Sequence, residues 1–288
     1  MIRKSKWLLA LFAVFAVVFA AACGGDDDDS KGGATPGAST AADATATPRT
    51  DPVTLRLGYF ANVTHAPALV GVKDGTFKKE LGDLVKLETK TFNAGPAVIE
   101  ALFANEIDIS YIGPNPAING YVQSNGEALR IIGGSTSAGA LLVVRPDAGI
   151  NSPKDFANKK VATPQLGNTQ DVALRAWLQE NGLKAKEQGG NVTVLPTENA
   201  TTLTLFQKGD IDAAWVPEPW ATRLVQQAGG KVFLDEKSLW PGGQFVTTHI
   251  IVRTEFLKKY PDVVEKFLAA NVKVIQAINA DPEKAKTT

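Results

Sequence analysis

The sequence predicts an α/β protein of two lobes, each a mostly parallel sheet flanked by helices. Two stretches, residues 106–117 (EIDISYIGPNPA) and 210–221 (DIDAAWVPEPWA), read almost as copies of each other. Each holds a short apolar run, typical of a buried parallel strand, and then a proline-rich turn where a helix can begin. In open α/β sheets, ligands bind at this carboxyl end of the strands. We therefore expect the two turns to face each other across a ligand cleft between the lobes.

The first part of the folded chain alternates strand, turn and helix. Residues 53–60 read as a strand, and Pro67 lies in the first turn of a helix that Asn62 or Thr64 caps. The other strands expected here cover residues 85–92, 129–133 and 140–144, and the helices cover residues 96–104 and 116–124. Such alternation favours parallel pairing of the strands.

The same alternation restarts after Pro146. The strands expected here cover residues 160–163, 191–195, 231–234 and 247–252, and the helices cover residues 171–179, 197–207, 221–228 and 255–280. Pro261 is expected to break the last of these helices. Asp281 and Pro282 read as the start of another helix, which we expect to continue past Thr288.

Two strand patterns, residues 141–144 and 247–252, both run into a Val-Arg pair. Together with the restart near Pro146, this match predicts that the chain crosses twice between the lobes. Residues 53–148 and 247–288 are expected to form the first lobe, and residues 149–246 the second.

The N-terminal 22 residues read as a lipoprotein signal peptide rather than as part of the fold. Three basic residues precede an apolar run that is too short to span a bilayer comfortably and ends in small residues. The following Cys23, in the sequence AAACG, resembles the acylated cysteine of a bacterial lipobox, although Ala20 stands where leucine is usual. Acyl chains on Cys23 would anchor the protein to the outer face of the membrane. The alternative is an ordinary cleaved signal with a leftover thiol.

Residues 23–52 are expected to be the acylated cysteine and a flexible tether. An aspartate run is followed by Gly, Ala, Ser, Thr and Pro with almost no large apolar side chain, so the segment cannot bury enough surface to offset its ordering entropy. Since Cys23 is the only cysteine, an internal disulfide is excluded.

Composition and motifs argue against several classes of function. The formal net charge is zero, whereas a nucleic-acid-binding protein would show a basic excess. The folded part holds two histidines, no cysteine, no Gly-Lys-Ser/Thr phosphate loop and no metal-ligand spacing. We therefore expect neither an enzyme nor a protein with a metal or cofactor.

Five strand-to-helix turns carry the polar residues expected to bind a ligand. Helix N-termini present unpaired N–H groups and partial positive charge, so several of them together make an anion site without Lys or Arg. Plain helix capping is the alternative for each turn taken singly. The candidates in these turns are Asn62, Thr64, His65, Gly95, Gly113, Pro114, Asn115, Gly167, Asn168, Thr169 and Glu218.

Three further features bear on the type of ligand. Glu218 either caps its own helix or receives a cationic or hydrogen-bond-donating group of the ligand. Trp215 either packs in the core or supplies an apolar wall of the site. Ser135 belongs to a polar loop near the lobe crossover, where it would contact the ligand or serve the hinge.

Four segments resemble the substrate-binding proteins of ABC importers for sulfonate, nitrate and taurine, a group that also includes thiamine-precursor binders. They are LRLGYFANVTHAPALVG, FNAGPAVIEALFANEIDISYIGPNPAI, VATPQLGNTQDVALRAWL and DIDAAWVPEPWA, and the likeness covers about residues 53–286. The resemblance implies a periplasmic-binding-protein-like fold of type II, with lobes that close on a ligand. It also implies delivery of that ligand to an ABC permease and its ATPase.

We therefore expect an extracytoplasmic, lipid-anchored, monomeric solute-binding protein. Its ligand would be a small oxyanion such as an aliphatic sulfonate, taurine, nitrate or bicarbonate. One alternative is a binding protein for a thiamine pyrimidine precursor, or a biosynthetic enzyme of the same superfamily, although an export signal argues against a cytosolic enzyme. Another is the sensor domain of a signalling system.

Overall fold

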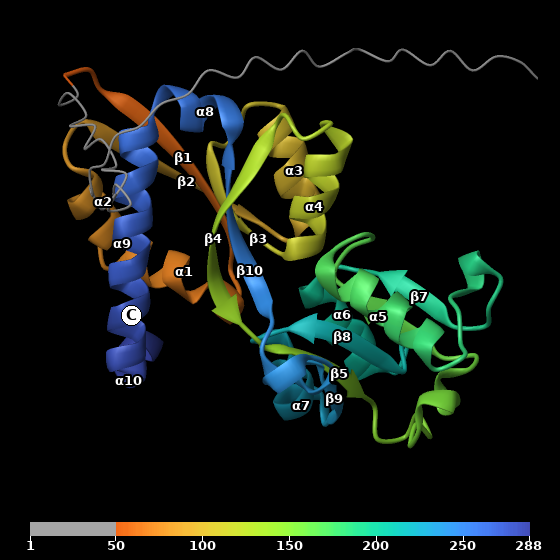
Figure 1. Ribbon diagram of the computed structural model, residues 1–288. Helices are drawn as coiled ribbons and strands as arrows, with labels where there is room; N and C mark the ends of the chain where they lie inside the picture. The colour runs from red at the N-terminus through yellow and green to blue at the C-terminus, as the bar shows by residue number, and fades with distance from the viewer. Residues whose placement is uncertain (1–49) are drawn as a thin grey trace, which may run out of the picture. The chain divides into compact units, whose positions relative to one another are not determined.

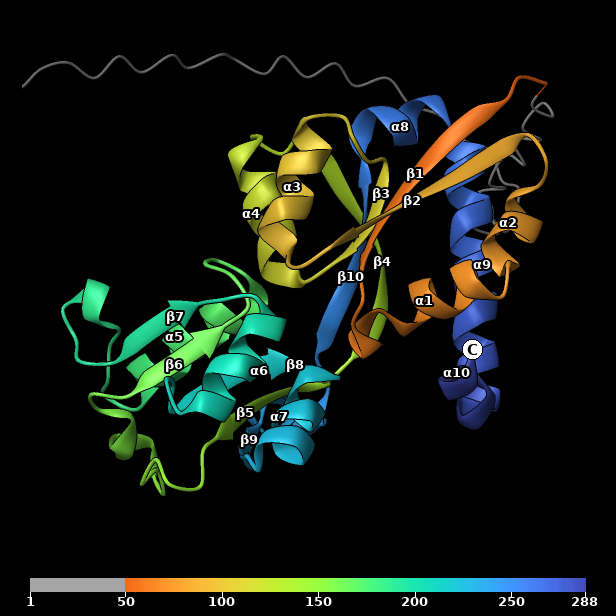
Figure 2. The same ribbon diagram turned by 180° about the vertical axis from the view of Figure 1, so that it is seen from behind.

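The computed structural model describes residues 50–288 (Figure 1). The predicted signal peptide, the acylation site at Cys23 and nearly all of the predicted tether lie outside the described residues. Within residues 50–288, the strands form two separate five-stranded sheets, each flanked by helices (Figures 1 and 2).

The first sheet has the strand order β2-β1-β3-β10-β4. Its strands are β1 (Val53–Phe60), β2 (Val85–Phe92), β3 (Ile109–Ile112), β4 (Leu129–Ser137) and β10 (Val246–Arg253). β1 pairs in parallel with β2 and β3, while β10 runs antiparallel between β3 and β4. The carboxyl ends of the parallel strands β1, β2 and β3 thus lie at the same end of the sheet.

The second sheet repeats this plan with the order β7-β6-β8-β5-β9. Its strands are β5 (Ala140–Val144), β6 (Lys160–Thr163), β7 (Thr193–Pro196), β8 (Ala213–Pro217) and β9 (Lys231–Asp235). β6 pairs in parallel with β7 and β8, and β5 runs antiparallel between β8 and β9. Each sheet is therefore mixed, with its antiparallel strand in the same place.

Helices cover both faces of each sheet. The first sheet carries α1 (Ala66–Lys73), α2 (Thr76–Leu81), α3 (Gly95–Phe103), α4 (Pro114–Gln123), α8 (Thr254–Lys259), α9 (Pro261–Ala280) and α10 (Pro282–Thr287). The second carries α5 (Thr169–Glu180), α6 (Asn199–Lys208) and α7 (Trp220–Ala228). The 3-10 turns are η1 (Val63–His65), η2 (Pro153–Phe156), η3 (Lys186–Gln188), η4 (Glu236–Leu239) and η5 (Pro241–Gly243).

The two-lobe α/β architecture predicted from the sequence is confirmed, with corrections at the crossover. Residues 140–144, expected in the first lobe, form β5 of the second sheet. The chain changes sheet at Ala138 and Gly139, which both have positive φ, and not at the proline that punctuates the sequence later. Because the crossing strands β5 and β10 run antiparallel to their neighbours, the sheets are mixed rather than mostly parallel. β4 also continues through Ser135, where a loop was expected, because β10 pairs with it there.

The ends of the C-terminal helices follow the expected signals. Pro261 separates α8 from α9. The carboxylate of Asp281 accepts a hydrogen bond from Lys284 N at 3.0 Å and so caps α10.

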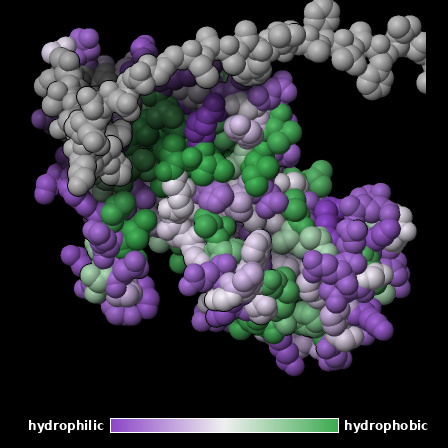
Figure 3. Space-filling view, viewed as in Figure 1, coloured by the Kyte–Doolittle hydropathy of each residue, from purple (hydrophilic) through white to green (hydrophobic). Residues whose placement is uncertain are grey.

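Each lobe has an apolar layer on both faces of its sheet. In the first lobe, Phe77 of α2 and Phe267 of α9 stack at 5.0 Å on one face, and Ile99 of α3 packs on the other. On the outside, Figure 3 shows apolar side chains gathered over α4, where Val122 is 64% exposed. The surface near α5 and β7 is mainly hydrophilic in the same view.

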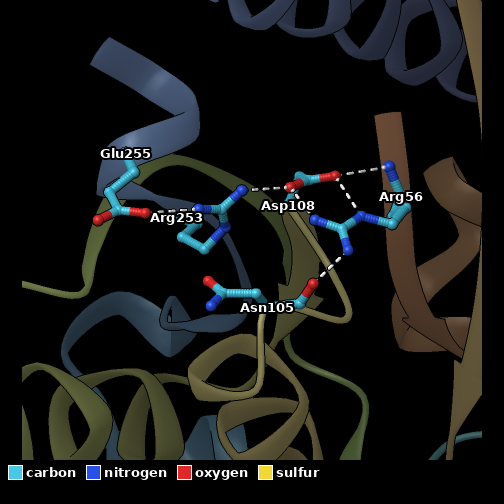
Figure 4. A network of polar contacts seen from close by, with 5 residues as sticks. All are labelled: Arg56, Asn105, Asp108, Arg253 and Glu255. Atoms are coloured by element: carbon cyan, nitrogen blue, oxygen red, sulfur yellow. Dashed lines mark hydrogen bonds and ion pairs between the residues drawn. The ribbon is translucent and has the colours of Figure 1, made fainter. Parts of the chain in front are cut away.

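A buried carboxylate joins three strands of the first sheet (Figure 4). Asp108, 1% exposed, accepts hydrogen bonds from Arg56 Nε at 2.8 Å and Arg253 Nη2 at 2.8 Å, and Arg253 also pairs with Glu255. Burial pushes the pKa of Asp108 up, but the hydrogen bonds from the two arginines outweigh it and hold that pKa below its ordinary value. Asp108 therefore stays charged and ties β1 and β10 to the start of β3.

The second copy of the sequence motif, residues 210–221, repeats these backbone contacts, but its aspartate is not paired with two arginines. Asp108 N donates to Arg56 O, and Asp212 N donates to Lys160 O, both at 2.9 Å. The arginine of each Val-Arg pair makes a matching backbone contact: Arg253 N donates to Asp108 O, and Arg145 N donates to Asp212 O. Within residues 50–288, however, the carboxylate of Asp212 accepts a hydrogen bond only from the backbone, at Lys160 N. The sequence repeat is thus a structural repeat, with an arginine pair in one copy.

We expect Asp108→Asn to lower the free energy of unfolding by about 2 kcal/mol, because it removes a buried charge between two arginines. The matched control is Asp212→Asn, for which we expect a loss below about 1 kcal/mol, since only a backbone hydrogen bond is weakened. Urea denaturation of both variants measures the difference. Equal losses would show that the arginine pair adds nothing to the backbone contacts.

Candidate functional site

A small cavity lies where the two lobes meet. Its volume is about 30 Å³. Both lobes contribute uncharged side chains or glycines to its wall, which consists of Phe60, Asn62, Thr64, His65, Asn93, Ala94, Gly95, Gly113, Pro116, Pro164, Asn168, Thr169, Gln170, Asn199, Pro217, Thr247 and Thr248. Among these described residues there is no Lys, Arg, Asp or Glu.

Four helices begin at the cavity, two from each lobe. Gly95 opens α3 and Gly113 is the N-cap of α4, while Asn168 is the N-cap of α5 and Asn199 opens α6. Each helix start presents backbone N–H groups that have no partner within the helix and carries partial positive charge. The cavity is therefore electropositive without holding a cationic side chain.

His65 contributes a neutral ring. It is buried and stacks on Phe60 at 4.2 Å between ring centroids. Burial lowers the pKa of His65 to about 3, so the ring is uncharged at neutral pH. Its Nδ1 accepts a hydrogen bond from Phe60 N at 3.3 Å, which leaves Nε2 as the protonated nitrogen and the donor.

The turn before α1 is held by hydrogen bonds from both lobes. Thr64 O accepts from Thr136 Oγ1 at 2.6 Å and from Thr248 Oγ1 at 2.7 Å, both in the first lobe. From the second lobe, Trp220 Nε1 donates to Asn62 Oδ1 at 3.1 Å. Val63 N donates back across the boundary to Glu218 O at 3.0 Å. This turn is therefore the side on which the lobes stay joined.

The lobes also approach closely at Gly113 and Thr169. A Cβ placed on Gly113 would lie 2.2 Å from Thr169 Oγ1, so only glycine fits there. Thr169 Oγ1 and Asn199 Oδ1 are both buried and have no hydrogen-bond partner among the described residues. An unpaired buried polar atom costs on the order of 1–3 kcal/mol. The Thr169 hydroxyl can donate to an acceptor on a bound solute, whereas Asn199 Oδ1 can pair only with a donor.

The structure brings together more than half of the residues predicted to bind the ligand. Those that line the cavity are Asn62, Thr64, His65, Gly95, Gly113, Asn168 and Thr169. Asn199 was missed, although it follows strand β7 in a strand-to-helix turn like the others. The helix pattern was taken to begin at residue 197, and that start hid the turn.

Four other candidates lie outside the cavity wall. Pro114 and Asn115 form the first turn of α4, beyond the N-cap. Ser135 is in β4, beside Ala66 and Pro67 in a separate groove. Gly167 lies in another groove, against α4. Pro114, Asn115 and Gly167 belong to the predicted turns, but only part of each turn reaches the cavity wall.

Glu218 does not supply the charge that was expected in the site. Its carboxylate accepts hydrogen bonds from Thr222 N and Thr222 Oγ1, both at 3.0 Å, and so caps the start of α7. Neighbouring Pro217 lines the cavity, whereas Glu218 does not. Of the two alternatives left open by the sequence, the structure favours the helix cap.

Trp215 likewise packs in the core. It is fully buried in the second lobe, 6.2 Å from the ring of Trp177, and its Nε1 donates to Glu236 Oε2 at 2.8 Å. As a residue of β8, it points into the layer below the sheet rather than toward the cavity wall. Of the two alternatives that the sequence left open for Trp215, the structure favours packing in the core, where its indole pairs with a buried carboxyl group.

That carboxyl group, Glu236, titrates near neutrality. Burial raises its pKa from 4.5 to about 7, although hydrogen bonds from Trp215 and Trp240 favour the charged form. Because the folded pKa is the higher one, its contribution to stability is complete below pH 4.5 and is lost as pH rises toward 7.

We expect the free energy of unfolding of the wild type to fall by about 3 kcal/mol more than that of Glu236→Gln between pH 4.5 and pH 7.5. The amide still accepts the indole hydrogen bond but does not titrate. Urea denaturation at a series of pH values measures both curves. Parallel curves would contradict the raised pKa.

Comparison with known proteins identifies the family. The model of the NMT1-like family matches residues 49–288. The chain belongs to this family. Among relatives, it is 28% identical over 217 residues to the taurine-binding periplasmic protein of Escherichia coli (strain K12), covering 75% of this chain and 64% of that protein. It is 28% identical over 220 residues to a putative aliphatic sulfonates-binding protein of Bacillus subtilis (strain 168), covering 74% and 62%.

A solved structure of another protein has the same fold. The alkanesulfonate-binding protein SsuA from Xanthomonas axonopodis pv. citri, bound to MOPS, superimposes with a TM-score of 0.71 at 19% identity, covering 82% of this chain and 78% of that chain. This match confirms the two-lobe periplasmic-binding-protein fold. The chain spans less than two thirds of the length of the two curated relatives above.

These relatives are named as binding proteins rather than enzymes. Within residues 50–288, no three His, Cys, Asp or Glu side chains are placed to hold a metal ion. The helices of the same range are also too short or too polar to cross a membrane.

Proposed function

We propose that this protein is the extracytoplasmic solute-binding component of an ABC importer and binds a small oxyanion between its lobes. The solutes that fit this proposal are aliphatic sulfonates, taurine, nitrate and bicarbonate. Closure of the lobes on the solute would create the surface that a membrane permease and its ATPase recognise. We further propose that the binding protein acts as a monomer.

The observation that carries the proposal is the charge-free cavity at four helix starts. An oxyanion placed there would accept hydrogen bonds from backbone N–H groups of both lobes and from the neutral His65. A cationic solute would meet the same partial positive charges without any carboxylate among the lining residues. The ligands in the names of the relatives, taurine and aliphatic sulfonates, support the same class of solute.

The alternative of a thiamine-precursor enzyme has less support. Such an enzyme would use histidine chemistry, but the ring of His65 is stacked on Phe60 and its Nδ1 is occupied by a backbone hydrogen bond. His65 is better placed to orient an anion.

A panel of oxyanions tests the binding function. We expect at least one of taurine, ethanesulfonate, nitrate and bicarbonate to raise the melting temperature of the wild type, because the bound solute stabilises only the folded state. Gly113→Ala should weaken that binding by roughly tenfold, since its methyl group would push Thr169 away and hold the lobes apart.

Gly133→Ala is the matched control for this variant, because a Cβ at Gly133 meets no heavy atom closer than 3.8 Å. It should bind as the wild type does. The proposal fails if none of the anions shifts the melting temperature. It also fails if Gly113→Ala binds as tightly as Gly133→Ala.

The anchoring of the protein is proposed from the sequence around Cys23, which resembles a lipobox. Acylation at Cys23, with residues 24–52 as tether, would hold the folded lobes near the permease at the membrane surface. This arrangement suits a binding protein that must meet its transporter repeatedly.

Expression of the full chain in a bacterium with a lipoprotein-processing pathway tests the anchor. We expect the wild type in the membrane fraction and Cys23→Ser in the soluble extracytoplasmic fraction, because the acyl chains provide the membrane affinity. Palmitate labelling of the wild type alone would accompany this shift. An unlabelled wild type in the soluble fraction would instead indicate an ordinary cleaved signal.

A further inference from the structure

A second groove adjoins the cavity and is called the outer groove. It shares three lining residues with the cavity, Asn93, Ala94 and Pro164, and it encloses about 480 Å³. Both lobes line it, since Asn93 and Ala94 follow β2 of the first lobe and Pro164 follows β6 of the second. A solute too long for the cavity would therefore extend into this outer groove.

The walls of the outer groove are mixed: Thr91, Asn93, Gln165 and Glu198 are polar, and the other six lining residues are apolar. Phe92 and Ala97 come from the first lobe, and Leu166 and Pro196 come from the second. Leu166 is 63% exposed, which leaves a large apolar side chain uncovered at the groove. These apolar surfaces suit a short alkyl chain, because its burial removes apolar surface from water.

One charged side chain interrupts these walls. Glu198 is the only Asp, Glu, Lys or Arg among the described residues that line the outer groove. It is the N-cap residue of α6, but its carboxylate makes no capping hydrogen bond. The side chain reaches across to the first lobe instead, where Oε1 accepts from Asn93 Nδ2 at 2.7 Å.

The contact between Asn93 and Glu198 lies where the cavity meets the outer groove, because Asn93 lines both. It shows that the carboxylate of Glu198 already receives an N–H donor from across the cleft. An ammonium group at the end of an alkyl chain presents the same donor with a full positive charge. A carboxylate in that place would be repelled by Glu198.

We propose that the outer groove is the tail subsite of the solute, and that it selects an alkyl chain ending in an ammonium group through Glu198. The favoured ligand is thus a small ω-amino oxyanion, with its anionic head at the helix starts and its ammonium group beside Glu198. This inference rests on the proposed function, because it places the oxyanion head in the cavity. It assigns to Glu198 the charge that the sequence had suggested for Glu218.

Calorimetric titration with three sulfonates of matched length tests the proposal. The ligands are 3-aminopropanesulfonate, butanesulfonate and 4-sulfobutanoate, whose tails end in an ammonium, a methyl and a carboxylate group. We expect the wild type to bind the amino compound about fivefold more tightly than the alkyl compound, and the carboxylate compound most weakly. In Glu198→Gln the fivefold preference should disappear, while the affinity for butanesulfonate stays within about twofold.

Glu218→Gln is the matched control, since it removes an equal charge from a carboxylate held by Thr222 outside both the cavity and the outer groove. It should keep the order of the three ligands. Equal affinities of the wild type for the amino and alkyl compounds would overturn the tail subsite and leave the proposed function intact. Loss of the preference in both glutamine variants would also overturn it. If the wild type binds none of the three sulfonates, the tail subsite is overturned, whereas the proposed function fails only if nitrate and bicarbonate do not bind either.

Discussion

Two chain passages join the lobes, one from β4 into β5 at Ala138 and Gly139, and one into β10 after Phe245. They are tied together, because Ala138 N donates to Phe245 O at 3.3 Å and Thr247 Oγ1 donates to Ala138 O at 2.5 Å. Glu218 N also donates to Gly139 O at 2.8 Å. Both passages lie on one side, so a hinge motion about them would part the lobes on the other side, where Gly113 meets Thr169 and Asn93 meets Glu198. The cavity lies between the joined side and the parting side.

The site is electropositive for a reason that charge counting does not reveal. Four helix starts converge on a cavity with neutral walls, and burial keeps His65 uncharged as well. Lysine or arginine would hold an anion more strongly in the open state, but each would need a partner whenever the solute leaves. Backbone N–H groups at helix starts need no such partner, and they are positioned by the fold itself. This arrangement suits a protein that must bind a solute and then release it.

The sequence predicted the strand-to-helix turns well because hydrophobic runs and prolines are local signals. It therefore identified Asn62, His65 and Thr169 as neighbours in one site. It misplaced β5, because the crossover at Ala138 and Gly139 depends on pairing with a distant strand and not on a local breaker. It also could not decide the directions of side chains: Trp215 turned toward the buried Glu236, and Glu218 toward Thr222. Those choices are made by tertiary partners far from each motif or by the helix that follows it.

The central claim is that an oxyanion is held by helix starts of both lobes in a cavity without charged side chains. A crystal structure of the complex with the tightest-binding oxyanion tests this most directly. We expect the anionic oxygens to accept hydrogen bonds from backbone N–H groups at the starts of α3 or α4 and of α5 or α6, with no Lys or Arg in contact. An anion bound by surface lysines or arginines, or held by one lobe alone, would contradict the account.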